Sequence, residues 1–180
     1  MDPLELYEKA SEWTKSKIEG AKDNLDAQTA CEEWSARDLV NHLLGGKDVF
    51  VGATQGKGPS GPPPPGKPAD LLGDGDPVAA FEDVRRAVLD AYGKEGVLEN
   101  PQMQMMAGIA FVDTLTHGWD LAKGTGQDTT MPAGLADAAM GAIGGRLTSE
   151  SRGTAFKPEV TAPDDASTQD KLICYMGRQP

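Results

Sequence analysis

The sequence has few basic residues for its size. Its 180 residues include 17 Lys and Arg against 28 Asp and Glu, which gives a formal net charge of -11. A surface that follows nucleic-acid phosphates needs clustered Lys and Arg, so this balance argues against nucleic acid as a partner. Long apolar runs are also missing. Because no segment reaches the roughly 18 consecutive apolar residues of a transmembrane helix, we expect no membrane span.

Cysteine is scarce as well. Cys31 and Cys174 lie far apart in the sequence. The N-terminal residues are acidic and lack the basic and apolar regions of a signal peptide, so we expect no export signal. Two reduced thiols are therefore favoured over a disulfide, and the cytoplasm is the expected location.

Strand signals are nearly absent, because alternating runs of β-branched and aromatic residues do not appear. Capping residues, prolines and glycines instead mark helical segments. These predicted helices cover residues 2–20, 35–51, 76–93, 102–123, 135–150 and 167–177. Four long helices with short ones appended predict an all-α fold, a helix bundle in a single domain over residues 1–180.

The segment 55–76 is predicted to be a loop, since it is rich in Gly and contains the run Pro62–Pro65. A stiff connector is favoured over a partner-binding polyproline motif. In the fifth helix, Gly141, Gly144 and Gly145 either weaken the helix or allow another helix to approach closely.

Histidine occurs only twice, as His42 and His117. His117 follows Asp113 by four residues on a helix that is apolar on nearly all sides, which predicts that both are buried. A buried carboxylate is costly unless a basic side chain, an imidazolium or a metal ion compensates it. No Lys or Arg lies on that helix face within a turn of Asp113.

His42 is the candidate third ligand, because it flanks the apolar stripe of the second helix. From spacing alone a simpler interpretation is favoured, in which Asp113 and His117 pair with each other and His42 lies on the surface. Asp38, four residues before His42, is a rival ligand. Its place in the first turn is better explained by a capping box with Ser35.

Two segments carry a family resemblance. Residues 29–46, TACEEWSARDLVNHLLGG, resemble the first motif of the DinB-like metal-binding superfamily, in the branch of the N-terminal domain of mycothiol-dependent maleylpyruvate isomerase. Residues 113–126, DTLTHGWDLAKGTG, resemble its second motif. The Pro-rich loop and the tail 163–178 are similar to those of small single-domain members.

The resemblance implies a DinB-like four-helix bundle that holds one divalent ion with three side chains. His42 falls at the ligand position of the second helix, and Asp113 and His117 fall on the later pair. The acid of this branch is usually Glu, so Asp113 is a shorter ligand. Zinc is the favoured ion, and nickel or iron also suits two imidazoles and one carboxylate.

In related proteins the metal activates a low-molecular-weight thiol, so the resemblance implies a mycothiol-type S-transferase or isomerase acting on a small electrophile. The alternative is a non-catalytic metal-binding or interaction module; a metal hydrolase would need a base that the sequence does not identify. A homodimer is compatible with the sequence.

Catalytic residues are not assigned by the sequence. Asp120 is interpreted as a hydrogen-bond acceptor behind the ligands, Trp34 and Trp119 as core side chains, and Cys31 as an inert thiol.

Overall fold

The computed structural model describes residues 2–31, 33–57, 66–147, 152 and 157–180. Within them every named element is a helix, and the only β-type pairing is one isolated bridge between Gln28 and Ser35. The predicted all-α fold is confirmed. Contacts divide the chain into two compact units, residues 1–130 and 131–180, which we describe separately; the single domain stays a prediction. None of the described helices combines the length and apolar character needed to cross a membrane.

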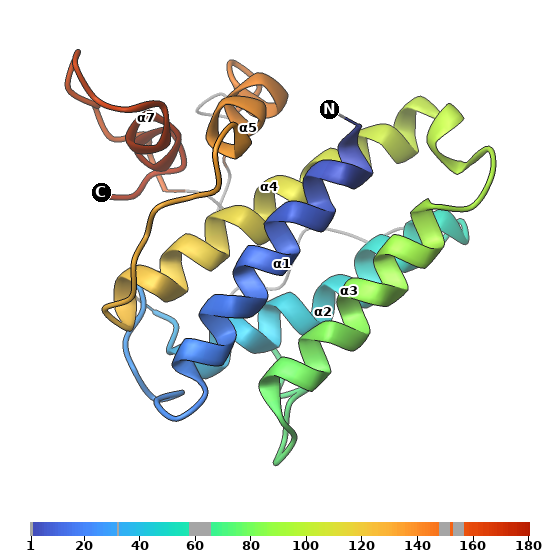
Figure 1. Ribbon diagram of the computed structural model, residues 1–180, viewed down its shortest axis with the longest axis horizontal. Coiled ribbons are helices and arrows are strands. Elements are labelled where there is room, and N and C mark those ends of the chain that lie inside the picture. Colours follow the sequence, from blue (N-terminus) through green and yellow to red (C-terminus); the bar gives the residue numbers. More distant parts are fainter. Residues whose placement is uncertain (1, 32, 58–65, 148–151, 153–156) are drawn as a thin grey trace. The chain divides into compact units, whose positions relative to one another are not determined.

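The first unit is a bundle of four helices. They are α1 (Pro3–Ala21), α2 (Ala36–Thr54), α3 (Pro77–Tyr92) and α4 (Pro101–Gly124), with the short 3-10 helix η1 (Val97–Glu99) before α4. α1 and α4 lie side by side and run in the same direction (Figure 1). α2 packs against α3 and α4, and α3 also packs against α1, so the four helices enclose one core. The predicted bounds of these helices agree closely with the structure.

The helix starts are fixed by the predicted caps. Asp2 accepts a hydrogen bond from the Leu4 amide, 2.7 Å away. At the start of α2 the capping box is complete: Asp38 N donates to Ser35 Oγ (3.2 Å), and Ser35 N donates to Asp38 Oδ2 (2.9 Å). Lys67 adds an ion pair to the same carboxylate oxygen at 2.7 Å. Asp38 is therefore a cap, as predicted.

The chain from residue 66 to 76 contains no helix and returns along α2. Asn41 Oδ1 accepts from the backbone amides of Leu71 and Leu72, each at 2.8 Å, and Arg37 donates to the Gly73 carbonyl at 2.9 Å. These bonds fix Leu71 beside α2. The run Pro62–Pro65 lies outside the described residues.

The second unit contains α5 (Leu135–Ile143) and α7 (Thr168–Tyr175). The prediction that the fifth helix continues to about residue 150 is wrong. Gly144 leaves the helix with φ -54° and ψ 126°, and Gly145 has φ 73°, which favours glycine. The Tyr175 hydroxyl donates to the Ile143 carbonyl at 3.0 Å and so links the two helices.

An ion-pair cluster joins α1 and α3 and predicts a pH-dependent stability. Arg85 first, and then Arg86 and Lys15, lower the pKa of Glu82 from 4.5 to about 2 against the opposing effect of burial. A lowered folded pKa means that this stabilisation is complete above about pH 4.5 and is lost as the pH falls towards 2. Glu82→Gln should therefore cost about 1 kcal/mol of unfolding free energy at pH 7, since solvent screens part of each pair.

Urea unfolding at pH 7 and at pH 2.5 measures this contribution. The difference between wild type and Glu82→Gln should shrink at the lower pH. Glu19→Gln is the matched control, because Glu19 has one exposed partner, Lys22, on its own helix. It should change stability by less than about 0.5 kcal/mol. An equal cost of Glu82→Gln at both pH values would contradict the prediction.

Candidate metal centre

α4 places Asp113 and His117 one turn apart on the same face. His117 Nε2 lies 3.5 Å from Asp113 Oδ1. His117 is buried and Asp113 is partly open to solvent. The apolar character of this helix on nearly all sides predicts burial, which is wrong for its first half, where Met105 and Ile109 are exposed. Its second half, from Ala110 on, is almost wholly buried.

His42 reaches the same carboxylate from α2. Its Nε2 atom lies 3.4 Å from Asp113 Oδ1, across 71 residues of sequence. The centres of the His42 and His117 rings are 4.6 Å apart, and the rings meet edge to face. The structure thus brings the three predicted ligands together: one donor atom from each of His42, Asp113 and His117 lies within 4.8 Å of the other two.

The separations are compatible with a metal ion held between the three residues. A good N–H···O hydrogen bond has its heavy atoms about 2.7–3.2 Å apart. Four tetrahedral ligands bound at about 2.0–2.1 Å are themselves separated by about 3.3–3.4 Å. The observed 3.4 and 3.5 Å from Asp113 Oδ1 to the two Nε2 atoms are closer to the second value. The residues present therefore fit a divalent ion, and the shorter Asp side chain still brings its oxygen to both nitrogens.

The electrostatics of the group are those of a carboxylate between two imidazoles. Burial alone would raise the pKa of Asp113, but His42 and His117 hold it well below its usual range. Burial alone would lower the pKa of His117, but the Asp113 charge raises it well above its usual range. The site thus stabilises positive charge beside the Asp113 carboxylate, whether that charge is a proton or a metal ion.

Asp120 orients His117 from behind. It is fully buried, and its Oδ2 lies 3.0 Å from His117 Nδ1. A proton on Nδ1 that is directed at this carboxylate leaves Nε2 free as an acceptor or ligand. Such a carboxylate–histidine pair commonly fixes the tautomer of a metal-binding imidazole. The sequence-based interpretation of Asp120 matches this arrangement.

The connection between α1 and α2 brings further side chains to the ligands. Gly124 allows it to approach α4, because a Cβ at Gly124 would lie 2.5 Å from the Gln28 carbonyl oxygen. The Ala30 amide also donates to the Asp120 carbonyl at 3.4 Å. As a result the Cys31 thiol donates to Asp120 Oδ2 at 3.2 Å. Sequence reasoning missed this contact, since nothing near Cys31 in the sequence indicates it.

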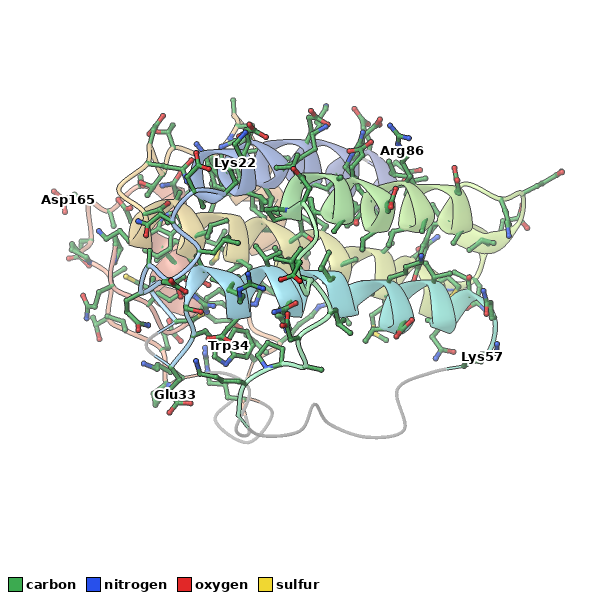
Figure 2. All side chains as sticks on the ribbon, turned by 90° about the horizontal axis from the view of Figure 1, so that it is seen from below. Lys22, Glu33, Trp34, Lys57, Arg86 and Asp165 are labelled. Atoms are coloured by element: carbon green, nitrogen blue, oxygen red, sulfur yellow. The ribbon has the colours of Figure 1, made fainter. Side chains whose placement is uncertain are left out.

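Trp34 lies against both imidazoles and not in the core. Its ring centre is 5.0 Å from that of His42 and 6.1 Å from that of His117. Its indole N–H donates to the Gly66 carbonyl at 3.3 Å. Figure 2 shows Trp34 beside the start of α2. The prediction of core packing is wrong for this partly exposed residue, while Trp119 is buried as predicted.

A second group of candidate ligands, Cys31, His117 and Asp120, shares His117 with the first. Its separations are 3.2 Å from sulfur to carboxylate and 3.0 Å from nitrogen to carboxylate. A thiolate ligand at about 2.3 Å and a carboxylate at about 2.0 Å would lie about 3.5 Å apart in a tetrahedral site. The shorter observed distances match hydrogen bonds better than metal ligands, which favours the first group as the metal site.

Comparisons with known proteins place the chain in a family. Residues 15–122 match the profile of the mycothiol maleylpyruvate isomerase N-terminal domain, a range that includes His42, Asp113, His117 and Asp120. Two Mycobacterium tuberculosis proteins are similar over nearly their whole length: uncharacterized protein MT0763 of strain CDC 1551 and uncharacterized protein Rv0738 of strain H37Rv. Each is 30% identical over 185 residues, covering 99% of this chain and 98% of the relative.

No solved structure matches the chain significantly. The family match covers more than half of the sequence and most of the four-helix bundle. Both the fold and the match lead to the same conclusion: the chain belongs to the mycothiol maleylpyruvate isomerase N-terminal domain family, which is a DinB-like family.

Proposed function

We propose that this chain binds one divalent metal ion with His42, Asp113 and His117 and serves a thiol-dependent transfer or isomerisation of a small electrophile. The observation that carries the proposal is the pair of separations, 3.4 and 3.5 Å, from one Asp113 oxygen to the two imidazole nitrogens. The family match supports a thiol of the mycothiol type as cosubstrate.

Three protein ligands leave at least one coordination position open, where a divalent ion can bind and ionise a thiol. Zinc is the ion that we expect, and nickel or iron(II) suits the same ligands. Asp120 holds the His117 ring in place through Nδ1. Trp34 lies against both imidazoles. The reduced thiol cosubstrate and the two free cysteines fit a cytoplasmic location.

A non-catalytic metal-binding module is the second candidate. It is favoured by the carboxylates near the ligands, because each one in the described part of the chain is already engaged. Asp120 interacts with His117 and Cys31, and Asp38 interacts with Ser35 and Lys67. A reaction that needs a separate protein base would therefore need one other than Asp38 or Asp120.

Titration of the metal-loaded protein with mycothiol distinguishes the two candidates. Calorimetry should detect saturable binding, and the visible spectrum of the cobalt-substituted protein should change with the same stoichiometry. Cysteine, which lacks the sugar part of mycothiol, is the control and should bind more weakly. Absence of both heat and spectral change with a fully loaded protein would leave the non-catalytic module as the better interpretation.

A further inference from the structure

The described residues expose three large apolar side chains. Leu71 is 54% exposed, Met105 is 50% exposed and Ile109 is 45% exposed. Scattered exposed apolar residues need no explanation, but a cluster often marks a binding site. These three belong to two segments of the first unit, and both segments adjoin the metal-ligand residues.

On α4 the exposed side chains lie in line with a ligand. Met105, Ile109 and Asp113 are spaced by four residues, so they lie on neighbouring turns of one helix face. Met106, which is half-buried, lies beside them. An apolar strip two turns long therefore leads along α4 to the Asp113 carboxylate.

On α2 the third apolar side chain lies close to the other ligand. Leu71 Cδ1 is 3.9 Å from the position that a Cβ of Gly45 would occupy, and Gly45 is one turn after His42. Asn41 holds Leu71 there, because the Leu71 backbone amide donates to Asn41 Oδ1 at 2.8 Å. Gly45 has no side chain of its own, so Leu71 can lie against the α2 backbone next to His42.

We propose that Leu71, Met105 and Ile109, here called the apolar rim, bind the hydrocarbon part of the electrophile beside the metal. The inferred substrate class is an electrophile with an alkyl or aryl group of several carbons next to its reactive atom. This inference rests on the proposed function and names its substrate. Its physical basis is burial of apolar surface at a site where thiol and electrophile have to meet.

The size of the rim favours a small molecule over a protein partner. Three side chains about half exposed offer on the order of 300 Å², whereas a stable interface buries about 800 Å² on each partner. Small-molecule sites are mostly apolar with a few fixed polar groups. The three apolar side chains of the rim and the three proposed metal ligands have this composition. Both segments of the rim also adjoin a proposed ligand, since Leu71 lies against Gly45 one turn after His42, and Ile109 precedes Asp113 by one turn of α4.

Alkyl hydroxamates test the rim, because the hydroxamate group binds an open metal position and the chain length can be varied. The zinc-loaded protein is titrated with aceto-, butyro-, hexano- and octanohydroxamate, and its zinc content is measured afterwards. Affinity should rise about two- to fourfold for each added methylene that the rim buries. The gain should stop once the chain extends beyond Met105.

Substitutions locate the effect. Ile109→Gln and Met105→Gln should each weaken octanohydroxamate about fivefold to tenfold and leave acetohydroxamate unchanged. Both positions are exposed, so the variants should fold. Leu4→Gln is the matched control, because Leu4 is a partly exposed residue of α1 near Gly93. It should bind all four hydroxamates as wild type does.

Three outcomes would overturn the inference. If all four hydroxamates bind equally, the metal centre stands and the rim does not bind hydrocarbon. If light scattering shows a wild-type dimer that Ile109→Gln converts to a monomer, the rim is an interface between two copies. If the protein retains no zinc, or zinc-loaded protein binds no acetohydroxamate, the proposed function itself fails and the substrate inference fails with it.

Discussion

Replacing His42 by alanine is expected to remove the metal ion and leave the fold intact. His42 is partly exposed, and its side chain contacts Asp113, Trp34 and His117. Loss of one of three ligands should weaken metal affinity by at least a hundredfold, since loss of an outer partner alone commonly costs 10- to 100-fold. Elemental analysis after dialysis should find metal in wild type and almost none in His42→Ala.

Thermal unfolding adds an independent measurement. An ion that binds only the folded state stabilises it by about 2.7 kcal/mol at a hundredfold excess over Kd. A chelator should therefore lower the melting temperature of wild type and leave that of His42→Ala unchanged. His117→Ala should also lose metal, and it should melt below metal-free wild type because buried Asp120 loses its imidazole partner.

Cys31→Ser separates the two ligand groups. If His42, Asp113 and His117 hold the ion, this variant should keep its metal, because the Cys31 thiol then acts as a hydrogen-bond donor to Asp120 and not as a ligand. Loss of metal from Cys31→Ser with retention in His42→Ala would assign the ion to Cys31, His117 and Asp120. An unchanged wild-type melting temperature after chelation would argue against a tightly held ion in either place.

Gly118→Ala is expected to destabilise the bundle by about 3 kcal/mol. Gly118 follows His117 directly and is the point of close approach between α4 and α1. An added Cβ would lie 2.8 Å from Trp13 Cζ3 and would collide with the Thr14 hydroxyl. Thr14 cannot easily move, because it is fully buried and its hydroxyl donates to the Thr114 carbonyl at 3.0 Å. Overpacking of this kind costs about 1–3 kcal/mol and at times more.

Thermal and urea unfolding of the metal-free protein measure this cost. A loss of about 3 kcal/mol should lower the melting temperature of a 180-residue chain by about 6–12 °C. Gly108→Ala, on the same helix, is the control, because nothing lies within 4 Å of its added Cβ. It should be neutral or stabilising by up to about 1 kcal/mol. Equal effects of the two substitutions would refute the close-packing argument.

The helices of the first unit could be predicted because their signals are local. A cap such as Ser35 with Asp38, or a Pro in the first turn after Asp76, acts within four residues of sequence. The same locality made Asp113 and His117 recognisable as a pair on one face. The end of the fifth helix was mispredicted because Gly144 and Gly145 were compatible either with a weakened helix or with close helix approach. The backbone conformation at these two glycines ends the helix at Ile143.

The sequence by itself determined the all-α fold, the bounds of the four bundle helices and the three candidate ligands, with the family resemblance selecting His42 as the third. Only the tertiary structure decided that His42 and His117 approach the same Asp113 oxygen, that Trp34 lies against their rings, and that Cys31 reaches Asp120. It also decided that the first half of α4 exposes Met105 and Ile109. The physical reason is that these contacts depend on how the helices pack against one another. Steric fit at residues such as Gly118 and Gly124 sets that packing, and no local sequence pattern encodes the fit.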